Sequence, residues 1–228
     1  SRVFTKAGYI KVGIFSVIFF TGVFIVYFIT LDARTLPIYN PYQLNPDVVD
    51  VSMQNVTKDH KIADFSLIDQ EGKTVTENDF EGKIYVADFF FTTCQSICPK
   101  MSGQMQRLSV EFEEDDELKF ISHTVYPEVD SVPLLEAYAK DYGANRNKWE
   151  LVTGDKKQIY DLARKSYFAV TTEGDGGEGD FIHTENFVLV DKEKRLRGFY
   201  DGTKPEEIDQ LIEDIEILKN EYAKLDEH

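Results

Sequence analysis

The chain has 228 residues, of which 29% are charged, and its 25 Lys and Arg against 41 Asp and Glu give a formal net charge of -16. This acidic balance argues against nucleic acid as a partner, because phosphate backbones are bound by patches of Lys and Arg. Two cysteines are too few for the disulfide framework of a small secreted protein or for a four-thiolate metal cage, so any cysteine chemistry uses one pair.

The first predicted element is a transmembrane helix over residues 12–31, a run without charged side chains. Its length matches the roughly 20 residues that cross about 30 Å of hydrocarbon, so membrane lipid is its expected partner. Arg2, Lys6 and Lys11 precede it, and the positive-inside rule therefore places residues 1–11 in the cytoplasm. We expect an uncleaved anchor rather than a signal peptide, whose apolar core is shorter.

The remainder of the chain is then extracytoplasmic and strongly acidic. Without the three basic residues before the anchor, 22 Lys and Arg stand against 41 Asp and Glu, which gives -19. Residues 32–59 contain Pro37, Pro41 and Pro46 and are expected to form an extended tether. No Arg-rich, acid-poor presequence is recognised, which favours a bacterial inner membrane with a periplasmic C-terminal domain over the mitochondrial intermembrane space.

Residues 60–228 are predicted to form one domain that alternates strands and helices. Strands are expected over 62–68, 74–76, 83–91, 118–125, 149–153, 186–190 and 195–200. Helices are expected from the cysteine pair to about residue 114 and over 133–142, 155–167 and 205–225, with Asp155 as an N-cap. This order predicts an α/β, thioredoxin-like fold, in which a central mixed sheet has flanking helices and β-hairpin additions.

The two cysteines, Cys94 and Cys98, follow the most hydrophobic strand and precede Pro99. Their i,i+4 spacing at a helix start predicts two sulfurs on one face and a low pKa for both thiols. Three interpretations remain open: a disulfide staple, a redox-active dithiol, and a metal site. Closing so short a loop stabilises a fold by only about 2 kcal/mol, and a metal site needs further ligands.

Four histidines are available as a third ligand. His228 is terminal, His60 lies at the edge of the domain, and His123 ends a central strand, where a structural role is favoured. His183 follows a Gly-rich acidic loop, residues 173–180, that would be able to swing a side chain over the dithiol. Two thiolates and one imidazole suit Cu(I). Met101 and Met105 also carry soft sulfur atoms, but their helical spacing is typical of core residues.

The segments FFFTTCQSICPKM, VYPEVDSVP, FIHTENFVLVD and GFYDGT resemble the Sco (SenC-type) family of membrane-anchored copper chaperones. The resemblance extends over about residues 61–222. It implies a thioredoxin-like fold, copper binding through Cys94, Cys98 and His183, and a role in assembling the dinuclear copper site of cytochrome c oxidase. The oxidase subunit that carries this site is then the expected protein partner, and the ion is expected as Cu(I), with Cu(II) as the alternative.

The chain departs from the family pattern at three places. Gln95 and Ser96 stand where the family usually has Pro and Asp, the segment after Val125 lacks one acid and one Arg, and Ile182 replaces an Asp that commonly precedes the histidine. The metal ligands survive these changes, whereas the identity of the client does not follow from the resemblance.

From these observations we expect a metallochaperone rather than an enzyme. It would deliver copper to the dinuclear site or prepare the thiols of that site. A thiol–disulfide oxidoreductase of the cell envelope that uses the same cysteine pair is the first alternative. A stably bound accessory subunit of a membrane complex is the second.

Overall fold

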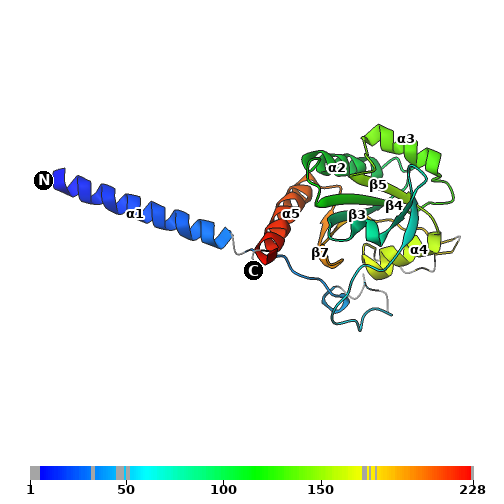
Figure 1. The fold of residues 1–228 in the computed structure, drawn as a ribbon, viewed down its shortest axis with the longest axis horizontal. Coiled ribbons are helices and arrows are strands. Elements are labelled where there is room, and N and C mark those ends of the chain that lie inside the picture. Colours follow the sequence, from blue (N-terminus) through cyan, green and yellow to red (C-terminus); the bar gives the residue numbers. More distant parts are fainter. Residues whose placement is uncertain are drawn as a thin grey trace. The chain divides into compact units, whose positions relative to one another are not determined.

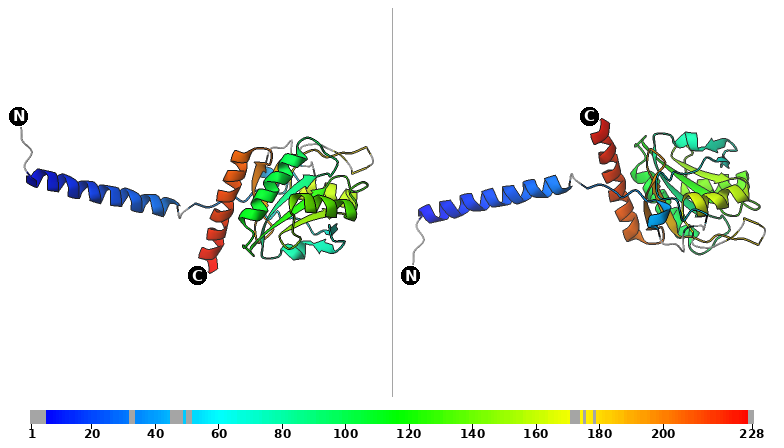
Figure 2. Two further views of the ribbon diagram at one scale, coloured as in Figure 1. Left: turned by 90° about the horizontal axis from the view of Figure 1, so that it is seen from above. Right: turned by 90° about the horizontal axis from the view of Figure 1, so that it is seen from below.

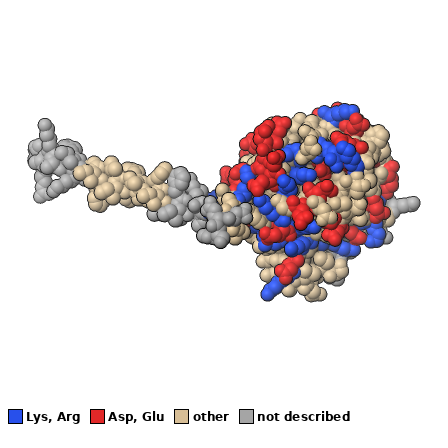
Figure 3. Space-filling view, viewed as in Figure 1, with Lys and Arg blue, Asp and Glu red and all other residues tan. Residues whose placement is uncertain are grey.

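The computed structural model describes residues 6–31, 34–44, 49, 52–170, 174, 176–177 and 179–226. The chain divides into two compact units, Ser1–Thr35 and Leu36–His228. The first contains α1 (Lys6–Leu31), a helix that includes the whole uncharged run. Its described side chains, residues 13–25, are exposed, and Figure 3 shows no acidic or basic side chain among them. None of the helices in the described part of the chain is both long and apolar enough to cross a membrane.

The second unit is built on a seven-stranded mixed sheet in the order β2-β1-β5-β4-β3-β6-β7. Its strands are β1 (Ser66–Asp69), β2 (Thr74–Thr76), β3 (Ile84–Phe90), β4 (Leu118–Thr124), β5 (Trp149–Thr153), β6 (Asn186–Val190) and β7 (Leu196–Asp201). The three central strands, β3, β4 and β5, are parallel, and the hairpins β1–β2 and β6–β7 join them antiparallel on either side. The predicted parallel core with added hairpins is confirmed.

Helices cover both faces of this sheet (Figure 1). One face carries α2 (Cys98–Glu111), α3 (Val132–Tyr142) and α5 (Pro205–Asp226), and Figure 2 shows α5 beside α2. The other face carries α4 (Lys156–Asp161), its continuation η4 (Leu162–Ser166), and the chain that precedes β1. The short 3-10 helices are η1 (Pro41–Gln43) and η3 (Glu77–Phe80).

The apolar sequence patterns account for the two cores. All seven residues of β3 are buried, as expected of a continuous apolar strand with helices on both faces. Met101 and Met105 are fully buried among the side chains of one core, which confirms their predicted packing role. The buried apolar stripe of α5 ends at Tyr222. Leu225, the last residue of the predicted helix, is 68% exposed.

The N-terminal edge of the second unit is held by a buried arginine. Arg197 of β7 donates from Nη2 to the carbonyl of Leu36 (2.8 Å) and from Nε to that of Pro37 (3.0 Å). Its guanidinium also pairs with Asp191 and Glu221, and it is 3% exposed. Residues 36–44, expected as part of the tether, thus belong to the compact unit. Residues 32–33, 45–48 and 50–51 of the same stretch lie outside the described residues.

The helix expected over residues 155–167 changes character halfway. Asp155 caps it as predicted, because its carboxylate accepts the backbone N–H of Gln158 at 2.8 Å. After Asp161 the chain widens into the π-helix η4, where the N–H of Tyr167 donates to the carbonyl of Leu162 (2.8 Å). Single π turns of this kind are often found at functional sites.

Candidate metal-binding site

The cysteine pair lies in the turn between β3 and α2. The helix begins at Cys98, with Pro99 in its first turn, so Pro99 opens it as expected. Cys94 precedes the helix, and its N–H donates to the carbonyl of Phe91 at 3.3 Å. The two sulfurs are adjacent, as predicted, but they do not share one helical face, because Cys94 stands before the first residue of α2. Both thiols are free, with Cys94 half-buried and Cys98 buried.

The two thiols have very different acidities. Burial works against ionisation of Cys94, but the backbone N–H of Ser96, the Cys98 thiol and the Cys98 N–H donate to its sulfur and lower its pKa to about 7. Burial, together with the hydrogen bond to Cys94, raises the pKa of Cys98 to about 12. The expectation of two low-pKa thiols is thus corrected to one, because the turn presents its N–H groups to a single sulfur.

A buried carboxyl group braces the start of this turn. Asp130, in the loop after β4, accepts the N–H of Thr92 (3.1 Å) and the Thr92 hydroxyl (2.5 Å), and also the hydroxyl of Thr124. It is fully buried. Because Thr92 stands two residues before Cys94, this brace fixes where the cysteine turn leaves the sheet.

A second buried carboxyl group, that of Asp88, lies in β3 near the pair. Burial raises the pKa of this carboxyl group to about 7, although a hydrogen bond with Ser122 acts in the opposite direction. One of its oxygens has no hydrogen-bond partner in the described structure. Its charge is among the influences that raise the pKa of Cys98. Asp88 was not predicted from the sequence, although it is the only ionisable residue between Lys83 and Cys94 apart from Tyr85.

His183 is exposed and lies against aromatic rings that reach towards the cysteine turn. Its ring centroid is 4.9 Å from that of Phe181 and 6.3 Å from that of Phe91. The Phe91 and Phe181 rings meet edge to face at 5.1 Å. Phe91 therefore links the two parts of the predicted site, since its carbonyl accepts the Cys94 N–H and its ring contacts the imidazole.

The predicted ligands are brought to one region without forming a closed cage. No three His, Cys, Asp or Glu side chains in the described part of the chain converge closely enough to hold a metal ion. The two sulfurs are joined by a hydrogen bond, and the imidazole stands beside Phe91. The donor types nevertheless fit a soft, low-coordinate ion, because the Cys94 sulfur is about half ionised at pH 7.

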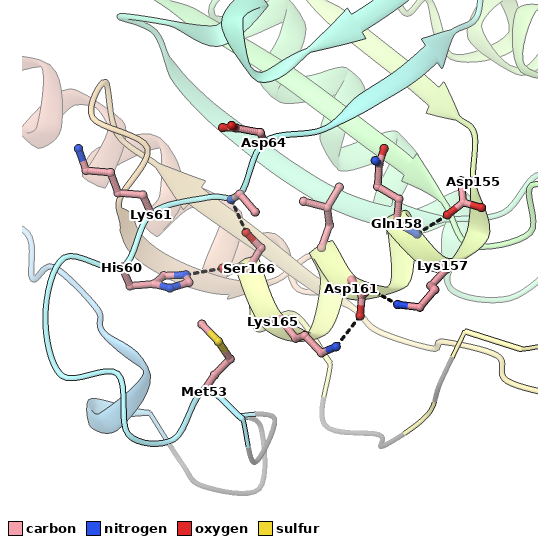
Figure 4. A pocket seen from close by; sticks show the side chains of 12 residues that line it. Met53, His60, Lys61, Asp64, Asp155, Lys157, Gln158, Asp161, Lys165 and Ser166 are labelled. Carbon is pink, nitrogen blue, oxygen red and sulfur yellow. Dashed lines mark hydrogen bonds and ion pairs between the residues drawn. The ribbon is translucent and has the colours of Figure 1, made fainter.

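The other histidines have different surroundings. His123 is buried and stacks on Phe89 at 4.9 Å, and burial lowers its pKa to about 4, which fits the structural role expected for it. His60 lines a separate cavity of about 510 Å³ between residues 53–64 and the α4–η4 segment, where its Nε2 lies 2.8 Å from the Ser166 carbonyl oxygen (Figure 4). His228 lies outside the described residues.

Three comparisons place the chain among known proteins. The family model SCO1/SenC matches residues 53–220. A SCO1 protein homolog of Bacillus subtilis is 30% identical over 158 residues, which are 68% of this chain and 81% of that protein. BsSco, a member of the Sco family of cytochrome c oxidase assembly proteins with a disulfide switch, matches at TM-score 0.59 and 29% identity, over 70% of this chain and 93% of that one. Copper-bound ScoI of Arabidopsis thaliana matches at TM-score 0.54 and 25% identity, over 71% of this chain and 98% of that one.

Proposed function

The chain belongs to the SCO1/SenC family, and from this membership and the cysteine pair we propose that it is a copper-binding assembly factor for cytochrome c oxidase. It would deliver copper to the dinuclear site of the oxidase or prepare the thiols of that site. The observation that carries the proposal is the free pair Cys94 and Cys98, with one low-pKa thiol, in a turn whose Phe91 also contacts His183. Copper-bound and oxidase-assembly relatives support it.

In this proposal copper is the cargo, and Cys94, Cys98 and His183 are its ligands. Cys94 supplies a thiolate near neutral pH, whereas Cys98 gives up its proton only when the ion arrives. The two soft sulfurs favour Cu(I), with Cu(II) as the alternative. Three ligands leave the ion open to a client sulfur, so transfer would proceed by ligand exchange.

The same asymmetry favours a second candidate function, thiol–disulfide exchange. The Cys94 thiolate would attack a client disulfide, which forms a mixed disulfide and releases one client thiolate. After losing its proton, Cys98 would attack the Cys94 sulfur, which releases the second client thiolate and leaves a Cys94–Cys98 disulfide. Two electrons pass to the client, and a reductant of the cell envelope must restore the pair.

Competition for Cu(I) against a coloured chelator tests the site assignment in the purified full-length protein. We expect Cys94→Ser, Cys98→Ser and His183→Ala to weaken binding at least tenfold, and His228→Ala, the matched histidine control, to leave it unchanged. Full affinity in Cys94→Ser or His183→Ala would remove those residues from the site. His183→Ala also separates the two functions, because disulfide exchange does not need the imidazole.

Attachment to the bacterial inner membrane through residues 12–31, with the second unit in the periplasm, stays a prediction from the sequence. Carbonate extraction of cell membranes tests the attachment, and protease access from the periplasmic side tests the orientation. Purification in mild detergent, followed by identification of what co-purifies, tests the alternative of a stably bound accessory subunit. A stoichiometric partner that survives washing would favour that alternative over transient delivery.

A further inference from the structure

The loop before His183 was expected to swing freely, but the segment that carries the histidine is anchored at both ends. We propose that the ion pair between Arg164 and Asp180 positions His183 for the cysteine pair. Arg164 and Asp180 would thus be positioning residues of the metal site. The inference rests on the proposed function, since it assigns these two residues to the same site.

The first anchor is the ion pair itself. Arg164 Nη1 donates to Asp180 Oδ2 at 2.6 Å, and Nη2 donates to Oδ1 at 2.7 Å. This bidentate geometry fixes the orientation of the two side chains as well as the distance between them. Both side chains are nearly buried, with 6% and 9% exposed. The Asp180 carboxylate also accepts the N–H of Gly176 at 2.8 Å, and the Tyr160 hydroxyl donates to the Asp180 carbonyl at 3.3 Å.

The second anchor follows directly after the histidine. The Thr184 hydroxyl donates to the carbonyl of Ala169 at 2.5 Å, and the Asn186 side-chain amide donates to the same oxygen at 2.9 Å. Ile182, between the anchors, is buried. Only residues 181–183 separate Asp180 from Thr184, and so short a chain has little reach. His183 is therefore presented by a short strap, and its approach to the sulfurs must come mainly from rotation of its side chain.

Both anchors connect the strap to a single irregular stretch, residues 164–169. This stretch contains the end of η4 and then Phe168, whose φ of 48° is unusual for an aromatic residue. Phe168 is buried and packs against the ring of His60 at 4.8 Å, while His60 and the backbone N–H of Ala63 both hydrogen-bond Ser166 (Figure 4). Packing thus maintains a costly backbone shape, and that shape presents both Arg164 and the Ala169 carbonyl to the strap.

Gly174 offers a way to disturb the ion pair without changing any charge. A Cβ at this position would collide with the carboxylate of Asp180 and, at 2.5 Å, with Nη2 of Arg164. Gly179, in the same loop, has no atom within 4 Å of the corresponding position. Gly174→Ala is therefore a steric probe of the pair, and Gly179→Ala is its matched control.

The experiment measures Cu(I) affinity of the full-length protein for Gly174→Ala, Asp180→Asn and Gly179→Ala, each with His183 intact and in a His183→Ala background. We expect Gly174→Ala and Asp180→Asn to lower affinity about tenfold when His183 is present, in line with residues that orient a metal ligand. In the His183→Ala background both should have no further effect. Gly179→Ala should match the wild type in both backgrounds.

Equal losses with and without His183 would show a merely structural role, and unchanged affinity in Gly174→Ala and Asp180→Asn would overturn the inference. A second readout needs no copper: nuclear magnetic resonance of the His183 ring in the metal-free protein should change in Gly174→Ala and not in Gly179→Ala. If the wild type binds no copper, the proposed function fails, while an unchanged ring signal refutes the positioning role by itself. If Asp180→Asn does not fold, it is replaced by Arg164→Lys, which keeps the positive charge but cannot form the bidentate pair of hydrogen bonds.

Discussion

The reactivity of Cys94 provides the most direct test of how the turn works. In the reduced, metal-free protein we expect Cys94 to be alkylated by iodoacetamide with a pH midpoint near 7, because its pKa is lowered to about 7. Cys98, whose burial and hydrogen bond to Cys94 raise its pKa to about 12, should remain unmodified over the same range. The pair would then behave as one nucleophile and one protected thiol.

The expected size of the effect follows from these values. At pH 7 a thiol with a pKa of about 7 is about half ionised, whereas a thiol at the ordinary value of 9.0 is about 1% ionised, a ratio of about 50. A less basic thiolate is also a weaker nucleophile, and a Brønsted coefficient of 0.4–0.5 over two pKa units reduces the advantage about eightfold. Cys94 should therefore react about sixfold faster than an unperturbed thiol at pH 7.

The assay follows the two cysteine peptides by mass spectrometry after timed alkylation between pH 5 and 10. Cys98→Ala, which removes a donor to the Cys94 sulfur, should raise the Cys94 midpoint more than Ser96→Ala, which leaves the Ser96 backbone N–H in place. Cys94→Ser is the control for slow labelling of Cys98. A wild-type midpoint at 9 or above, or faster labelling of Cys98 than of Cys94, would refute the reasoning.

Three further predictions concern stability and are measured by urea denaturation. The pKa of Asp88 is about 7 in the folded protein and about 4 in the unfolded chain. Between these two pH values the folded protein holds a proton that the unfolded chain has lost, so the free energy of unfolding falls as the pH rises. The free energy of unfolding of Asp88→Asn should therefore rise relative to that of the wild type as the pH increases over this range, by at most about 4 kcal/mol at pH 8. A difference that does not change with pH would contradict the raised pKa of Asp88. Asp130→Ala leaves buried donors of Thr92 and Thr124 unpaired and should cost about 3 kcal/mol at pH 7; a loss below about 0.5 kcal/mol would mean that the brace is not formed. Leu211→Ala, in the buried face of α5, should cost about 2–5 kcal/mol, whereas Leu225→Ala, at an exposed position, should change stability little; equal effects would contradict the observed end of the stripe.

Regular, strongly patterned segments could be predicted from the sequence nearly to the residue. The strands Trp149–Thr153 and Asn186–Val190 have the expected bounds, and Asp155 caps its helix as expected. These features depend on neighbours in the sequence, because burial periodicity and capping are local. The nearness of Cys94 and Cys98 was foreseeable for the same reason.

The interactions that shape the site are not local. Arg164 and Asp180 are 16 positions apart, and Thr92 and Asp130 are 38 apart, so no spacing rule connects them. The acidity of the thiols was misjudged because it depends on which backbone N–H groups the turn directs at which sulfur. The swinging loop was inferred from glycine content, whereas hydrogen bonds from Thr184 and Asn186 to Ala169 fix the end of the strap next to His183.

The contacts of Arg197 with Leu36, Pro37 and Glu221 have a practical consequence for where the second unit can be truncated. A fragment that starts at residue 60, the boundary suggested by composition, would lose the carbonyls of Leu36 and Pro37 and leave two donors of a buried guanidinium without acceptors. It would also lose the bridge between Tyr39 and Leu196. Because Glu221 in α5 pairs with the same guanidinium, a truncation at either end of the unit weakens the contacts that hold the other end. A shortened protein for copper titration should therefore start at or before Leu36 and retain α5 to its end.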